Sequence, residues 1–73
     1  MKPTARLESW IYDSDNKIFW GYIYDDTRNR WWDGAHIHTS YCPSPQAREG
    51  DTIATLNSTY LLGKPLGENN DRS

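Results

Sequence analysis

The sequence has 73 residues and a formal net charge of −2, so it lacks the basic surplus that dominates nucleic-acid binding. No apolar run approaches the roughly 18 residues of a membrane span, and no secretory signal sequence is visible at the N-terminus. The single cysteine, Cys42, cannot form an internal disulfide. These features predict one small domain in a reducing cytoplasm, with no membrane partner.

The hydrophobic pattern of the N-terminal half has the period of two that is typical of β-strands. After a short leader at 1–5, we expect a strand at 7–13, a turn at 14–17 and a second strand at 18–24. Asp, Asn and Ser side chains in the turn can bond to their own backbone. The second strand is rich in aromatic and β-branched residues, which makes it the clearest strand in the chain.

The positions of several residues in these two strands can also be predicted. Leu7, Ser9 and Ile11 are expected on one face of the first strand, because alternate residues share a face. Trp20 is expected in the core. Gly21, inside the second strand, indicates a bulge or the close approach of another backbone segment.

The C-terminal half predicts further short strands separated by turns and loops. After a turn at 25–29 come a strand at 30–32 and the pair Asp33-Gly34, which favours a tight type I′ hairpin turn. The strand that follows, 35–41, places His36, His38 and Ser40 on one face and Ala35, Ile37, Thr39 and Tyr41 on the other.

A proline-containing loop at 42–49 then leads to two last strands, at 52–56 and 59–62, which precede a flexible tail at 64–73. One mostly β domain at 6–63 results, a small antiparallel meander or an SH3-like barrel of five to six short strands. Edge strands left open in such a fold favour pairing with another copy of the chain, so a homo-oligomer is expected.

Two arginines and two tryptophans lie close together at 28–32 and form a candidate binding site: Arg28, Arg30, Trp31 and Trp32. Guanidinium groups bind phosphate, and indole rings stack on bases. Adjacent strand residues point to opposite faces, so one of the two indoles is expected in the core and the other exposed or in an interface. In the alternative interpretation, the arginines are simply solvated.

His36 and His38 are spaced to share one strand face. They could bind one zinc ion with Asp33 and Cys42 as further ligands, but this spacing matches no closed structural zinc pattern. We therefore expect surface or ligand-facing histidines, with no metal and no cofactor. Ser40 or Cys42 could pair with His38 as nucleophile and base, but no sharp elbow turn or glycine-rich oxyanion loop accompanies them. The protein is therefore not expected to be an enzyme.

Two blocks of the C-terminal half, DGAHIHTS at 33–40 and GDTIATLNSTYLLG at 50–63, resemble a block in small phage and prophage proteins. The shared pattern is DG-x-x-I-x-TS, a spacer, then GD-x-I-x-T-x-NS-x-Y-x-L. The chain also resembles the strand-rich part of the phage anti-Thoeris proteins, oligomeric sponges that sequester cyclic nucleotide immune signals. The resemblance implies a β fold, an oligomer and a pocket near the NS-x-Y turn, shaped by Thr39, Ser40, Asn57, Ser58 and Tyr60.

Three classes of function remain. The first is a small phage-type protein, in counter-defence or regulation, that binds and inhibits a host protein through an aromatic and arginine surface, since Trp, Tyr and Arg are enriched at interface hot spots. The second is an oligomeric sponge for a cyclic nucleotide immune signal. The third is a small-barrel nucleic-acid-binding protein, which the net charge disfavours. If the chain is phage-encoded, its expected location is the host cytoplasm.

Overall fold

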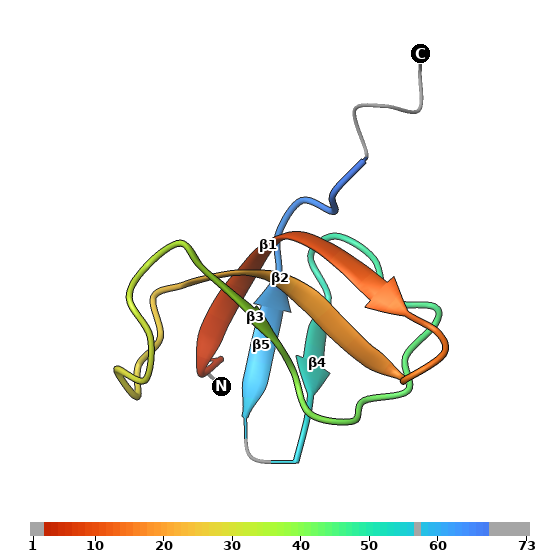
Figure 1. Ribbon diagram of the computed structural model, residues 1–73, viewed down its shortest axis with the longest axis horizontal. Helices are drawn as coiled ribbons and strands as arrows, with labels where there is room; N and C mark the ends of the chain where they lie inside the picture. Colours follow the sequence, from red (N-terminus) through yellow and green to blue (C-terminus); the bar gives the residue numbers. More distant parts are fainter. Residues whose placement is uncertain (1–2, 57, 68–73) are drawn as a thin grey trace.

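Five strands form one sheet in a computed structural model that describes residues 3–56 and 58–67. The sheet order is β3-β2-β1-β5-β4 (Figure 1). The strands are β1 (Ala5–Asp13), β2 (Ile18–Tyr24), β3 (Ala35–His38), β4 (Thr52–Ala54) and β5 (Thr59–Leu62). The prediction of a small all-β fold is confirmed. Within the described ranges, no helix is long and apolar enough to cross a membrane.

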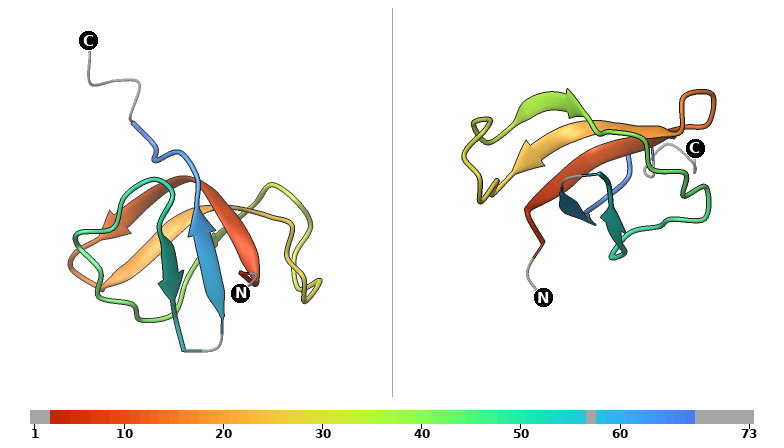
Figure 2. Two further views of the ribbon diagram at one scale, coloured as in Figure 1. Left: turned by 180° about the vertical axis from the view of Figure 1, so that it is seen from behind. Right: turned by 90° about the horizontal axis from the view of Figure 1, so that it is seen from below.

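The sheet departs from a wholly antiparallel meander at one pairing. β1–β2, β2–β3 and β4–β5 are antiparallel, whereas β5 runs parallel to β1. The chain crosses between β3 and β4 to the far side of β1, and there β5 pairs with β1 in the parallel direction. In the right-hand view of Figure 2, β1, β2 and β3 form one layer, and β4 and β5 form a second layer drawn below it.

The hydrophobic core fills the space between these two layers. Its largest fully buried side chains are Phe19, Leu7, Ile23 and Leu62. Trp10 is 6% exposed, and its indole N–H donates a hydrogen bond of 2.8 Å to the Gly63 carbonyl. The expected core position of Trp20 is wrong: this side chain is only half-buried, because it lies on the opposite face of β2 from Phe19.

A β-bulge in β1 decides which residues reach the core. Glu8 pairs with Tyr22 and Ile11 with Trp20, so two residues of β1, Ser9 and Trp10, lie opposite Gly21 alone. Ser9 adopts a positive φ of 50° at this point.

The bulge reverses the expected alternation. Leu7 and Trp10 both face the core, whereas Ile11 is 43% exposed on the outer face. The expected close approach of backbone at Gly21 is confirmed, because a Cβ atom there would lie 3.1 Å from the Glu8 carbonyl oxygen, as well as 2.8 Å from Cγ of Leu7.

The connection between β2 and β3 is a ten-residue loop at 25–34, so the strand expected at 30–32 is wrong. The Asp26 carboxylate accepts hydrogen bonds from the amides of Arg28 and Arg30, which holds this segment in a loop rather than in the sheet. The turn at Asp33-Gly34 also differs from the expected type I′ hairpin, since only Gly34 has a positive φ, at 88°.

The ends of the domain extend beyond the expected range of 6–63. Thr4 in the expected leader donates its amide to the carbonyl of Thr59. In the expected tail, the Lys64 carbonyl accepts from the Ser9 amide at 2.8 Å, and the Leu66 amide donates to the Trp10 carbonyl at 2.9 Å. Residues 64–66 are therefore attached to β1 at its bulge. Residues 1–2 and 68–73 of the expected leader and tail lie outside the described residues.

Candidate binding surface

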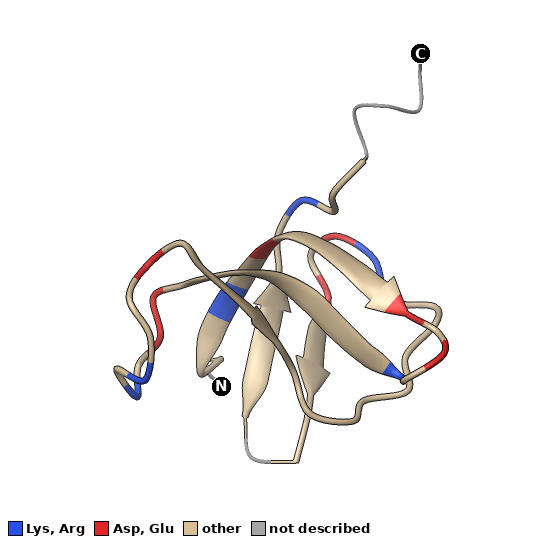
Figure 3. Ribbon diagram, viewed as in Figure 1, with Lys and Arg blue, Asp and Glu red and all other residues tan. Residues whose placement is uncertain are grey.

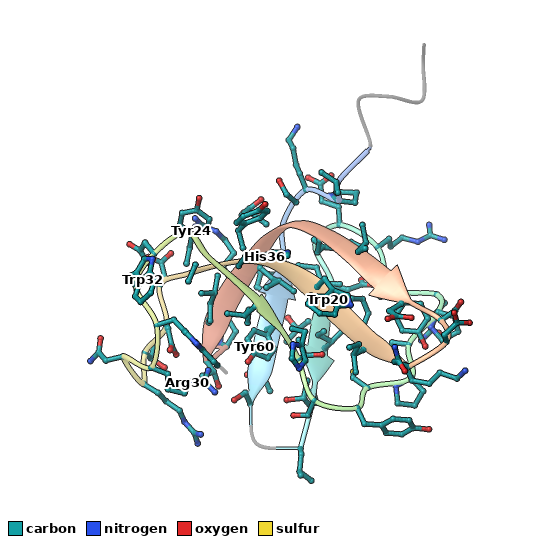
Figure 4. All side chains as sticks on the ribbon, in the orientation of Figure 1. Trp20, Tyr24, Arg30, Trp32, His36 and Tyr60 are labelled. Atoms are coloured by element: carbon teal, nitrogen blue, oxygen red, sulfur yellow. The ribbon has the colours of Figure 1, made fainter. Side chains whose placement is uncertain are left out.

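Aromatic rings cover the outer face of β2 and β3, on the side away from the core. The ring centroids of Trp20 and His38 lie 4.8 Å apart, as do those of Tyr22 and His36, and Trp20 and His36 are 5.8 Å apart. Trp20 pairs with His38, and Tyr22 with His36, across the two strands. Figure 4 shows Trp20 and His36 on these neighbouring strands. The side chains form one continuous array of four rings.

Two aliphatic residues extend this array across β1. Ile11 comes from the far side of the bulge, and Leu66, which is 59% exposed, comes from the segment attached to it. Together with Trp20, Tyr22, His36 and Ser9 they line an open hollow of about 370 Å³. We call this surface the aromatic face and define it by Ile11, Trp20, Tyr22, His36, His38 and Leu66.

An apolar outer face is unusual for a sheet of this kind. Antiparallel sheets with one face on the core normally present polar residues on the other, and contiguous exposed apolar patches mark interaction sites. Tyr22 is 40% exposed and Ile11 43%, although neither is needed to close the core. The arrangement is suited to covering a flat or extended partner.

Charged side chains of β1 and the loop after β2 lie near the aromatic face. Arg6 is held in ion pairs with Glu8 at 2.9 Å and Asp25 at 3.1 Å, and its guanidinium lies over the Tyr24 ring. Asp13, the last residue of β1, accepts a hydrogen bond of 3.4 Å from the Trp20 indole. Figure 3 shows acidic positions at this end of β1 and in the turn after it. The hydrogen bond from the Asn16 side chain, helped by the Asn16 amide, lowers the pKa of Asp13. Its carboxylate is therefore charged at neutral pH.

The loop at 25–34 contains a second cluster, organised by Asp26. The Asp26 side chain is only 1% exposed and forms an ion pair of 3.2 Å with Arg30. Burial opposes ionisation of Asp26, but hydrogen bonds from the Arg30 side chain and from two backbone amides outweigh it and lower its pKa. Arg30 also donates to the Ser58 hydroxyl at 3.0 Å. The loop is thus attached to the chain next to β5.

The Arg30 guanidinium is therefore already engaged by partners within the protein, although the residue itself is exposed. Burial disfavours its charged form, but the hydrogen bond to Asp26 and the nearby Tyr60 outweigh burial and raise the pKa of Arg30. Its guanidinium lies over the ring of Trp31 at 4.7 Å. Figure 4 shows Arg30 and Tyr60 close together, with Trp32 farther out on the loop.

The residues predicted as binding residues separate into three places. His36 and His38 lie in the aromatic face. Arg30, Ser58 and Tyr60 come together at the base of the loop, where Ser58 is 8% and Tyr60 3% exposed. Arg28, Trp31 and Trp32 are exposed on the loop. The expectation that one of the two adjacent indoles lies in the core is wrong, because Trp31 is 37% and Trp32 76% exposed.

The two predicted residues after β3 have different environments. Thr39 is 2% exposed; its hydroxyl accepts from the Phe19 amide at 3.1 Å and donates to the Ser40 carbonyl at 2.8 Å. This hydroxyl closes the end of the β2–β3 pair through these two hydrogen bonds. Ser40 is exposed. Asn57 lies outside the described residues.

The candidate nucleophile and metal ligands do not come together in the described residues. Cys42 is 4% exposed and its thiol donates to the Ala54 carbonyl at 3.3 Å. No group of three His, Cys, Asp or Glu side chains in the described ranges is placed to hold a metal ion.

Four members of the aromatic face were not predicted as binding residues from the sequence: Ile11, Trp20, Tyr22 and Leu66. The second strand contained a signal for two of them, since Trp20 and Tyr22 alternate with Phe19, Gly21 and Ile23. Such a strand is apolar on both faces, and one of those faces must lie outside a core this small. The bulge that exposes Ile11 left no comparable pattern.

Comparisons with protein-family models, curated proteins and solved structures found no match to this chain. The resemblance to phage proteins therefore stays a prediction, and the surface itself has to support any proposal about function.

Proposed function

We propose that the protein is a non-catalytic binding module that docks onto a partner protein through the aromatic face. The observation that supports this proposal is the continuous ring array of Trp20, Tyr22, His36 and His38 on the outside of the sheet. Aromatic residues contribute large apolar areas and dominate interface hot spots. Burying this face would remove apolar surface that now faces water.

Electrostatics favour a protein partner over a nucleotide or nucleic acid. A phosphate needs a cation or several N–H donors, and the guanidinium groups of Arg6 and Arg30 are both already paired with carboxylates. Arg6 is engaged by Glu8 and Asp25, and Arg30 is engaged by Asp26 away from the aromatic face. Asp13 adds a negative charge at the edge of Trp20.

The resemblance to small phage proteins suggests what the partner is. On that basis we propose a host protein as the partner, with inhibition or regulation as the outcome of binding. The exposed loop with Arg28, Trp31 and Trp32 offers a second contact region for the same partner, since Arg and Trp are both enriched at hot spots.

Photo-crosslinking tests the proposal in the cells in which the protein occurs. Benzoylphenylalanine is placed at Tyr22 in the aromatic face and, as a control, at Tyr41, which is 65% exposed outside it. We expect one defined crosslinked protein from position 22, lost when Trp20→Ala is added, and none from position 41. Equal products from both positions would contradict the proposal. Thermal stabilisation by a cyclic nucleotide, about 2.7 kcal/mol at 100 times its Kd, would favour the sponge instead.

A further inference from the structure

The free edge of β3 borders the aromatic face. The Thr39 amide donates to the Phe19 carbonyl at 2.9 Å, so Thr39 and Phe19 form a hydrogen-bonded pair of the β2–β3 ladder. Hydrogen-bonded and non-bonded pairs alternate in an antiparallel ladder. The main-chain N–H and C=O groups of His36 and His38 therefore point away from β2, toward the open edge of the sheet.

This edge is short, at four residues, but carries no charge or proline that would block an added strand. Natural edge strands are commonly blocked by charged residues, proline or a covering segment. β3 contains none of these residue types, and its ribbon in Figure 3 carries no charged position. Within the described ranges, neither histidine amide of β3 makes a backbone hydrogen bond outside the strand pairing.

A negative charge without a cationic partner lies next to the rings. Asp13 accepts hydrogen bonds from the Trp20 indole, from the Asn16 side chain and from the amides of Asp15 and Asn16. Among the described residues it forms no ion pair, and the Lys17 amine donates to the Ser14 carbonyl instead. A cation over the face of Trp20 would gain both the ring quadrupole and this carboxylate.

We infer that the docking segment of the partner is an extended strand that adds to the edge of β3 and carries a Lys or Arg side chain over Trp20. An added strand lies about 4.8 Å from β3, and its alternate side chains stand on the outer face beside His36 and His38. A long basic side chain at such a position extends across His38 to Trp20. This inference depends on the proposed function, because it describes the occupant of the same face.

A second copy of this chain fits the edge less well. Pairing β3 with β3 would bring two copies of the sequence Ala-His-Ile-His together. A partner strand with neither Lys nor Arg would then bring no such side chain to Asp13. Charge complementarity therefore points to a basic strand from a different protein.

Model peptides test the inference on the full chain. The probe is a capped seven-residue peptide of alternating Thr and Arg, compared with the same peptide carrying Glu in place of Arg. Two further versions carry N-methyl groups on alternate residues, so that one version blocks the main-chain donors facing β3. Binding is followed by amide NMR shifts and by Kd.

We expect the Arg peptide to shift the His36, Ile37 and His38 amides and to bind at least tenfold more tightly than the Glu peptide. One of the two N-methylated versions should lose at least tenfold in affinity. Asp13→Asn should weaken binding of the Arg peptide at least threefold. Asp15→Asn, which removes the same charge from the adjacent exposed turn, should change it less than twofold.

Three results would overturn the inference. Equal affinity for the Arg and Glu peptides would contradict recognition of a cation. Full binding by both N-methylated versions would contradict the addition of a strand to β3. Concentration-dependent dimerisation that shifts the β3 amides and blocks the Arg peptide would assign the edge to a second copy. If any of these occurs while crosslinking from position 22 persists, only the inference fails. If position 22 gives no defined crosslinked protein, the proposed function itself is contradicted.

Discussion

Trp10 and Trp20 lie on opposite faces of the same sheet, and truncating each should have very different consequences. Trp10 is 6% exposed, packs against Phe19 at a centroid distance of 5.7 Å and bonds to the Gly63 carbonyl. Trp20 lies half-buried on the outer face. Trp10→Ala should destabilise the fold strongly, and Trp20→Ala should do so weakly.

The expected magnitudes follow from burial. Truncating a core Trp costs about 3–5 kcal/mol, and an unpaired Gly63 carbonyl adds to that cost. A domain of this size has a total stability of about 4–11 kcal/mol, so Trp10→Ala should remove a large part of it or unfold the chain. Trp20 contacts two histidine rings and Asp13 but closes no cavity in the core, so Trp20→Ala should cost about 1 kcal/mol.

Urea unfolding at 25 °C, followed by circular dichroism, measures both variants against the wild type. Trp10→Phe serves as an intermediate that keeps most of the apolar volume and loses the indole N–H donor, at an expected cost of about 1–3 kcal/mol. Equal destabilisation by Trp10→Ala and Trp20→Ala, or a loss below about 1.5 kcal/mol for Trp10→Ala, would refute the assignment of the two faces.

Three further predictions concern other contacts. Gly21→Ala should destabilise by about 1–3 kcal/mol in urea unfolding, because the new methyl group would press on Leu7; an unchanged midpoint would contradict the close approach. Folding lowers the pKa of Asp26, so its ionised carboxylate stabilises the fold at pH values above its pKa in the unfolded chain. This contribution is lost as the pH falls through the lower pKa of the folded state. The free energy of unfolding should therefore decrease when the pH is lowered below about 4. The Asp26→Asn variant should be destabilised by about 1–3 kcal/mol at pH 7 and should show a smaller decrease in the same pH series. Trp32→Ala should change the midpoint by less than about 0.5 kcal/mol, since the side chain is 76% exposed; a larger loss would indicate a packing role for the loop.

The parts of the fold that the sequence predicts well are those set by neighbouring residues. The turn at 14–17 forms as expected, because the Asp13 carboxylate accepts the amides of Asp15 and Asn16. The strand after it, Ile18–Tyr24, has the predicted bounds. His36 and His38 lie on the exposed face and Ala35 and Ile37 on the buried one, because the period of two is uninterrupted there.

Errors arise where distant contacts override local pattern. The arginine and tryptophan segment at 30–32 looks like a strand, but the buried Asp26 carboxylate binds the Arg30 amide and guanidinium and holds it in a loop. Arg30 also donates to the hydroxyl of Ser58, which is 28 residues away in the sequence, and this bond attaches the loop to the segment before β5. Likewise, residues 64–66 resemble a tail in composition, and only the bulge in β1 gives them backbone partners.

One extra residue in β1 connects the fold with the proposed binding surface. Because two residues lie opposite Gly21, the side chains beyond the bulge switch to the other face of the sheet. Trp10 therefore enters the core, and Ile11 faces outward beside Trp20. The same irregularity leaves the Ser9 amide and the Trp10 carbonyl free to hold Lys64 and Leu66. A regular strand would bury Ile11 on the side of Leu7. The hollow in the aromatic face is thus a consequence of the bulge, which explains why β-strand periodicity alone did not predict it.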